Sequence, residues 1–212
     1  VIGGGRARLS DLIGMRVTIE AGRLSLSAGY AQADLAVHRD SAATLDLSPQ
    51  LLARLTGSGA DASFSSLGLQ WDDGRWIVSA ELARTTADAF TNSATGAYFA
   101  LARRFGSLTP YVSLAKQWQD QPLVNVAEAT TDAERYPITS FNRSRNQAQR
   151  SLTAGVRWDV LHNAAIKAEF AHMRTDSGAH GSFIARDNDN AFAPGLDHQS
   201  INLMSISVDV VF

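Results

Sequence analysis

The sequence predicts an all-β protein, an antiparallel up-and-down β-barrel that crosses a membrane with its strands. Segments of about ten residues that alternate apolar and polar side chains recur along the whole chain. The connections between these segments are alternately tight and long, which is typical of membrane barrels. The last segment has one apolar face, formed by Met204, Ile206, Val208 and Val210, and it ends on the aromatic residue Phe212.

The composition allows this fold and excludes several others. The chain has no cysteine, so disulfides and thiolate metal sites are excluded, and its formal charge of -2 provides no basic surface for nucleic acid. No apolar run approaches the roughly 18 residues of a transmembrane helix, whereas a barrel strand needs only every second residue to be apolar. The first residues, Val1-Ile-Gly-Gly-Gly-Arg6, lack the pattern of a secretory signal, so we expect a mature protein or a fragment.

Nine strands are predicted, each close to the roughly 9 to 11 residues that a tilted strand needs to cross the hydrocarbon core. In chain order they cover residues 14–20, 24–35, 63–71, 76–86, 95–105, 108–118, 151–160, 164–174 and 201–212. The apolar faces of the first four consist of Met15, Val17 and Ile19; of Leu24, Leu26, Ala28 and Tyr30; of Leu67, Leu69 and Trp71; and of Trp76, Val78, Ala80 and Leu82. The seventh strand alternates most clearly, with Leu152, Ala154, Val156, Trp158 and Val160 on one face. We take residues 1–212 as one barrel domain.

The connections also follow one rule. Tight turns near residues 21–23, 72–75, 105–108 and 161–163 alternate with polar loops near 36–62, 87–94, 119–148 and 175–199. In Asp72-Asp-Gly-Arg75, the glycine can supply the positive φ of a hairpin turn. Outer-membrane barrels have short periplasmic turns and long extracellular loops, and all eight connections agree with one orientation. This orientation places Phe212 at the periplasmic edge.

An odd number of strands is unexpected, because bacterial single-chain barrels close with an even number. Residues 2–10 could supply a tenth strand, with Asp11-Leu-Ile13 as a short outer turn, but three consecutive glycines make a poor strand interior. We therefore expect further strands upstream, because an unpaired strand edge cannot face lipid.

One loop is expected to contain a short helix near residues 48–56. Ser48 can cap its N-terminus, Pro49 suits the first helical position, and Gly57 can end the helix. Such a helix could cover the mouth of the barrel or fold into the lumen. We favour a position on the extracellular surface, where most loops lie.

Several segments carry a resemblance to a known family. They are Leu152-Thr-Ala-Gly-Val-Arg-Trp-Asp159, His162-Asn-Ala-Ala-Ile-Lys-Ala-Glu-Phe170, the ending Ser207-Val-Asp-Val-Val-Phe212, Gly68-Leu-Gln-Trp-Asp-Asp-Gly-Arg-Trp76 and Leu108-Thr-Pro-Tyr111. Over residues 12–212 the chain resembles the carboxy-terminal half of a proteobacterial outer-membrane porin, a barrel of about 16 strands.

The resemblance implies where the protein works and what it contacts. Such porins lie in the outer membrane of Gram-negative bacteria, against lipid and lipopolysaccharide, and often form homotrimers. Their terminal aromatic strand is recognised by the barrel-insertion machinery, and Phe212 matches that position.

If the apolar face meets lipid, the opposite face lines a lumen. The charged residues expected there are Arg16, Glu20, Glu81, Arg104, Arg157, Asp159, Lys167, Glu169 and Asp209. So many charges could not be buried in a dry core, and rings of charge set ion selectivity in pores. The alternative for each single residue is that it pairs across strands and only fills the interior. The densest predicted cluster joins Arg157 and Asp159 to Lys167 and Glu169.

The tryptophans Trp71, Trp76 and Trp158, together with Phe212, are predicted near the tight-turn end, where an aromatic girdle would contact the membrane interface. The alternative is ordinary packing in a soluble β-sandwich.

We expect a passive diffusion pore without enzymatic activity, cofactor or metal. His172, Asp176 and Ser177 could be arranged as a catalytic set, but no motif fixes them. The segment Asp187-Asn-Asp-Asn190 lacks the glycine and distal glutamate of a calcium loop. Two alternatives stay open, a plugged structural or adhesive barrel and a barrel enzyme.

Overall fold

The computed structural model describes residues 5–39, 48–49, 59–88, 92–122, 124–182 and 198–211. Within these ranges the chain forms one nine-stranded antiparallel sheet in which the strands follow each other in chain order. They are β1 (Gly5–Ala21), β2 (Leu24–Arg39), β3 (Ala60–Asp72), β4 (Trp76–Ala87), β5 (Ser93–Arg103), β6 (Leu108–Gln121), β7 (Gln149–Leu161), β8 (Ala164–Thr175) and β9 (Ser200–Val210). The predicted all-β, up-and-down fold is therefore confirmed.

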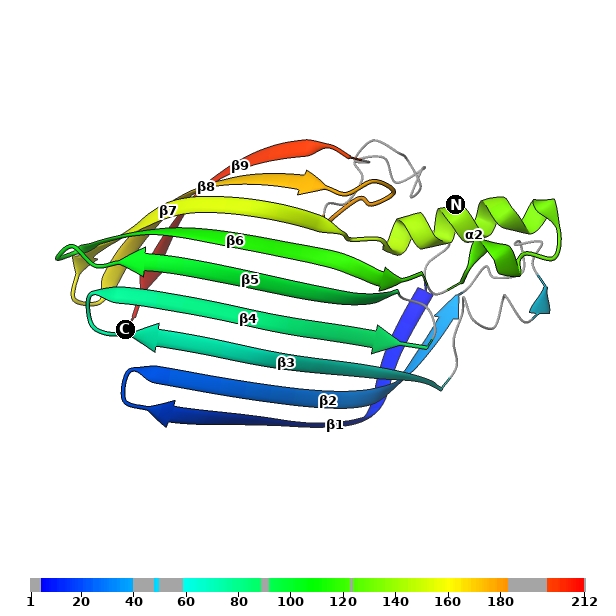
Figure 1. The fold of residues 1–212 in the computed structure, drawn as a ribbon, viewed down its shortest axis with the longest axis horizontal. Coiled ribbons are helices and arrows are strands. Elements are labelled where there is room, and N and C mark those ends of the chain that lie inside the picture. The colour runs from blue at the N-terminus through cyan, green and yellow to red at the C-terminus, as the bar shows by residue number, and fades with distance from the viewer. Residues whose placement is uncertain are drawn as a thin grey trace.

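The connections at the two ends of the sheet differ in length, as the spacing of the predicted strands required. Figure 1 shows the tight turns at the left end and the long connections at the right end of a curved sheet. Gly74, at φ 88°, and Gly106, at φ 62°, supply the left-handed backbone that two of the tight turns need. The sheet does not close, because its order begins with β1 and ends with β9, which form its two edges.

Strand β1 is longer than predicted, and residues 5–10, the described part of the possible tenth strand, belong to it. Pairing with β2 continues from Gly5↔Arg39 to Ala21↔Leu24 and is interrupted only between Ser10 and Ile13. Asp11, with a φ of 52°, lies in this interruption, which is a β-bulge and not a turn. A bulge lets both halves of β1 keep their hydrogen bonds to β2, which an outer turn at this point would have broken.

The two faces of the sheet differ in exposure as well as in chemistry. On the apolar face Leu67, Met204 and Ile206 are 61%, 80% and 78% exposed. On the polar face Ser66 and Ala165 are buried. Soluble monomers rarely expose a continuous apolar surface as large as a whole sheet face, so this face requires a covering medium or partner.

The long connection between β6 and β7 is folded. It contains the short 3-10 helix η2 (Val126–Glu128) and the α-helix α2 (Asp132–Arg145), which Figure 1 shows beyond the loop ends of the strands. The side chains of Val124 and Ile138 are fully buried there. This corrects the expectation of a polar loop at 119–148, because the connection contains helices and folds around a small apolar core. We call residues 124–148, which contain η2 and α2, together with residues 176–182 the loop cap.

Hydrogen bonds join the parts of the loop cap. Asp176 N and His180 N donate to the carbonyl oxygens of Ala148 and Asn146, over 3.0 Å each. Ser48 N donates to Glu134 Oε1 of α2 over 2.9 Å. The helix predicted near 48–56 otherwise lies outside the described residues. None of the described helices is both long enough and apolar enough to span a membrane.

Candidate functional site

The strand registers bring the predicted charged residues onto one face of the sheet. Cross-strand pairs such as Arg157↔Lys167 and Gly155↔Glu169 align the polar positions of β7 and β8. Asp209 is paired with Ala165, on the same face, and Glu81 is paired with Gly68 farther along the sheet. All nine predicted charged side chains belong to this face, which we call the charged face.

The residues of the densest predicted cluster form two separate sets of ion pairs, and Asp209 joins one of them. Arg157 lies between two carboxylates, with Nε 2.8 Å from Asp159 Oδ1 and Nη1 3.5 Å from Asp209 Oδ2. Lys167 Nζ lies 2.9 Å from Glu169 Oε1. The side chain of Arg157 is 47% exposed, so these pairs stay in contact with water. Partly exposed ion pairs add little stability.

Tyr111 of β6 supports this cluster and was not predicted. It pairs with Gly155 of β7, and a Cβ added at Gly155 would overlap the tyrosine ring. The ring therefore covers the glycine, an arrangement that stabilises glycine within a sheet. Lys167 Nζ lies 5.4 Å from the centre of the same ring, within the range of a cation–π contact. The signal in the sequence was an aromatic residue opposite a glycine, which becomes visible only once the register is known.

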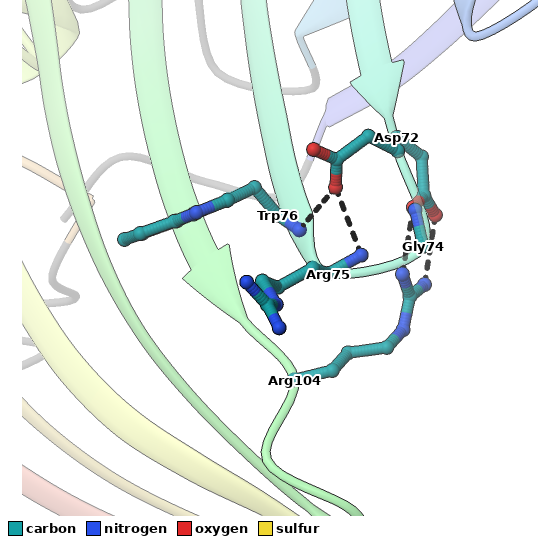
Figure 2. Close-up of polar contacts among 6 residues, drawn as sticks. Asp72, Gly74, Arg75, Trp76 and Arg104 are labelled. Carbon is teal, nitrogen blue, oxygen red and sulfur yellow. Dashed lines mark hydrogen bonds and ion pairs between the residues drawn. The ribbon is translucent and has the colours of Figure 1, made fainter.

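At the tight-turn end Arg104 pairs with Asp72, which the sequence placed in a turn without any further role. Its Nη1 and Nη2 donate to Asp72 Oδ1 and Oδ2 over 2.6 and 2.7 Å. The second acidic residue of the turn, Asp73, accepts from the backbone nitrogens of Trp76 and Arg75 (Figure 2). These donors hold the pKa of Asp73 below its usual value. The turn and the Arg104 pair thus fix this end of the charged face.

The remaining predicted residues of the charged face are less strongly paired. Arg16 Nη2 donates to Ser27 Oγ over 3.0 Å. Within the described ranges, Glu20 and Glu81 form no ion pair. Among the nine predicted residues and Asp72, four cations stand against six carboxylates. The charge of the face is therefore mixed, without an excess of cations.

The predicted tryptophans lie on the apolar face near the tight-turn end. Trp71 and Trp76 flank the turn between β3 and β4, and Trp158 is paired with Leu108 and Ile166. Arg103 is on the same face, with its guanidinium 4.9 Å from the centre of the Trp76 ring. A cation beside indole rings suits a membrane interface, where both groups can reach water.

The residues weighed for catalysis are not brought together as a set. Nδ1 of His172 is 2.8 Å from Asn202 Oδ1 on β9, so this histidine is bonded to a residue other than Asp176 or Ser177. Among the residues that the structure describes, no group of three or more acidic or histidine side chains could hold a metal ion. Phe212 and the segment 187–190 lie outside the described residues.

Comparison with known proteins gives a similarity of fold. No family model matches the chain, and no curated protein matches it. Among solved structures, an anion-selective porin from Comamonas acidovorans superposes with a TM-score of 0.52 at 15% identity. The sheet has a porin-like fold. The superposition covers 78% of this chain and 39% of the porin, so this chain spans less than half of that protein's length. An identity this low supports the fold alone.

Proposed function

We propose that this chain is part of an outer-membrane porin, a water-filled channel for passive diffusion of ions and small hydrophilic solutes. The observation that carries this proposal is the separation of the two faces by the strand registers. One face is apolar and exposed, with Leu67 at 61%, while the other gathers the ion pairs of Arg157, Lys167 and Arg104. A sheet with these two faces fits between lipid and water.

The state of the charged side chains supports a watery lumen. The side chains of Arg157, Asp159 and Asp209 are 47%, 45% and 58% exposed. If this face packed against a dry core, these charges would lose their hydration, which costs several kcal/mol for each ion. A water-filled space on this side avoids that cost. The proposed function is a non-enzymatic one, in which the shape and charge of the lumen act on the solute.

The open edges of the sheet support a larger barrel. Strands β1 and β9 are the two edges, and unpaired backbone groups cannot face the hydrocarbon core. We therefore include in the proposal further strands that complete the barrel. Assembly of a homotrimer and recognition of Phe212 by the insertion machinery belong to the same proposal, with the carboxyl terminus in the periplasm.

The mixed charge of the described face bears on selectivity. The structural neighbour is named an anion-selective porin, whereas the charged face here has more carboxylates than cations. Arg157 and Lys167 are both neutralised by adjacent carboxylates. From this part of the wall we expect weak selectivity with a slight preference for cations.

A conductance measurement tests the proposal. The full-length protein is refolded, its β-sheet content is checked by circular dichroism, and it is inserted into a planar bilayer. We expect stepwise increases in current that are proportional to bulk conductivity, as for a water-filled pore. Folded, inserted protein that carries no current would refute the channel.

The loop cap favours one alternative, a barrel whose extracellular loops carry the function. Its buried side chains Val124 and Ile138 show that the long connection is an ordered structure. In that case the loops would close or plug the mouth, and shortening residues 122–148 would increase conductance sharply. In an open porin the same deletion changes conductance little.

A further inference from the structure

A hollow lies in the charged face of the sheet, next to the loop cap. It has a volume of about 240 Å³ and is lined by residues of β4, β5, β6 and β7. Its floor consists of small residues, namely Ala83, Gly96, Ala115 and Ser151. A Cβ added at Gly96 would have only a carbonyl oxygen near it, 4.0 Å away, so the space above this glycine is open. We call this space the wall hollow.

One side of the wall hollow carries a carboxylate without a counter-ion and an aromatic ring. Glu81 of β4 is directly opposite Tyr98 of β5. The other neighbours of Glu81 on this face are Gly68 on β3 and Ser79 and Ala83 along β4, and none of them is basic. Within the described part of the chain, the Glu81 carboxylate forms no ion pair and accepts no hydrogen bond. Tyr98 is 41% exposed, so a solute can reach its ring.

The other side of the wall hollow carries two amides that the loop cap orients. Gln117 Nε2 donates to Gln147 Oε1 over 3.4 Å, and Gln149 Oε1 accepts from Ser182 N over 2.9 Å. Among the described residues, these bonds leave the oxygen of Gln117 and the amide nitrogen of Gln149 to a solute. Lys116 also borders the hollow, but its side chain belongs to the apolar face, because adjacent residues of a strand point to opposite faces.

The two sides of the wall hollow are too far apart for a small ion to contact both. Glu81 is on β4 and Gln117 is on β6, which places their backbones two interstrand spacings, or about 10 Å, apart. A simple amine would satisfy the carboxylate alone, and a neutral sugar would leave that carboxylate without a cation. A sugar ring with an ammonium group can contact both sides at once. The volume lies below the roughly 300 Å³ at which pockets for drug-sized ligands begin, so it suits a single ring.

We propose that the wall hollow binds an amino sugar, with its ammonium group at Glu81 and its hydroxyl groups at the two amides. The proposal rests on the proposed porin function, because a solute reaches this site only if the charged face borders the water path. The ring of Tyr98 adds to the attraction, since a cation is drawn to the face of an aromatic ring. Hydrogen bonds to a charged group contribute more than those between neutral groups. Glu81 is therefore the residue that selects the solute.

Removing the charge of Glu81 tests the proposal. Glucosamine is titrated into the full-length protein in detergent at a pH of about 6, where its amine is protonated, and binding is followed by saturation-transfer NMR. We expect E81Q to bind about tenfold more weakly than the unmodified protein, from the loss of a hydrogen bond between two charged groups. The control E20Q removes a carboxylate from the same face, outside the hollow and three strands away. It is expected to bind within about twofold of the unmodified protein, because salt screens charges at that separation.

A series of probes separates the contribution of charge from that of the ring. N-acetylglucosamine and glucose keep the ring without the cation, whereas ethanolamine keeps the cation without the ring. Glucosamine is expected to bind more tightly than all three. Equal binding of N-acetylglucosamine or of ethanolamine, or unchanged glucosamine binding in E81Q, would overturn the proposal.

Conductance recorded on the same samples distinguishes the site from the channel. In a conducting channel, glucosamine is expected to reduce the current of the unmodified protein and of E20Q more strongly than that of E81Q. Equal glucosamine binding by the unmodified protein and E81Q, in channels that conduct, refutes the site and leaves the porin standing. Folded, inserted protein without current refutes the porin, and the site is then judged by the binding measurements alone.

Discussion

Reversing the charge of Arg157 is expected to shift the ion selectivity of the channel toward cations. In the structure Arg157 bridges Asp159 and Asp209 on the charged face. A glutamate at this position would put three carboxylates side by side and change the local charge by two units. The side chain of Arg157 is 47% exposed, so water screens the effect.

The size of the shift follows from Coulomb's law. For an ion passing at about 8 Å in water, two unit charges change the energy by about 1 kcal/mol, which screening at about 0.1 M salt reduces to about 0.5 kcal/mol. A cation gains this energy and an anion loses it. The cation-to-anion permeability ratio is therefore expected to rise about fivefold in R157E.

The assay is the reversal potential of a planar bilayer under a salt gradient. A charge series makes it specific: R157K keeps the charge and leaves the ratio unchanged, while R157Q produces about half of the logarithmic shift. A conducting R157E channel with the ratio of the unmodified protein would show that Arg157 does not face the ion path. An increase of the same size in R157K would show that packing, and not charge, causes the change.

Three further predictions concern stability and the loop cap. Because a Cβ at Gly155 would overlap the Tyr111 ring, G155A is expected to lower the free energy of unfolding, measured in urea, by about 1 to 3 kcal/mol. Ile138 is fully buried in the loop cap, so I138A is expected to loosen α2 by about 2 to 4 kcal/mol, measured as faster proteolysis, whereas Y136A at an exposed position has no effect. Three hydrogen bonds to the Glu134 carboxylate, from Thr130 Oγ1 and from the backbone nitrogens of Ser48 and Thr130, lower its pKa from 4.5 to about 2. Because this pKa is lowered by folding, its contribution to the stability of the loop cap is complete above pH 4.5 and is lost as the pH falls toward 2. Hydrogen exchange in α2 is expected to report that loss, and E134Q to show a weaker pH dependence.

Each of these three predictions has its own control variant and its own contrary result. For G155A the matched variant is G96A, because the nearest atom to a Cβ at Gly96 is a carbonyl oxygen 4.0 Å away. Equal stability of G155A and G96A would contradict the close contact at Tyr111. Equal proteolysis of I138A and Y136A would show that the loop cap has no core. An unchanged pH profile in E134Q would assign the acid sensitivity to other carboxylates.

The alternation of side chains predicted most of the fold, because it is a local property. Side chains in a strand alternate between the two faces, so Arg157 and Trp158 had to lie on opposite faces wherever β7 was placed. The tight turns were predictable for the same reason, because they depend on single residues. Gly74, for example, supplies a positive φ that other residues adopt only with strain. The length of β1 was not predictable in this way. Its bulge at Asp11 depends on continued pairing with β2, and a short break in the pattern also fits a turn.

The candidate site was predicted as a set of residues but not as a set of contacts. Arg157, Asp159, Lys167 and Glu169 were expected together, because they lie near one tight turn on adjacent strands. The pairs of Arg104 with Asp72 and of Tyr111 with Gly155 join strands through the register, which alternation alone does not fix. The same holds for Lys116, Arg150 and Arg174, which the registers of three strands bring into one row.

By itself, therefore, the sequence determined the strands, their two faces and the alternation of turns and loops, because each depends on residues close together in the chain. Only the tertiary structure decided which side chains meet, because register is a relation between strands. It also decided how the connection after β6 folds, since the residues after β8 donate hydrogen bonds to Asn146 and Ala148, far from them in the chain. Which charges are paired, and which can act on a passing ion, follows from those contacts.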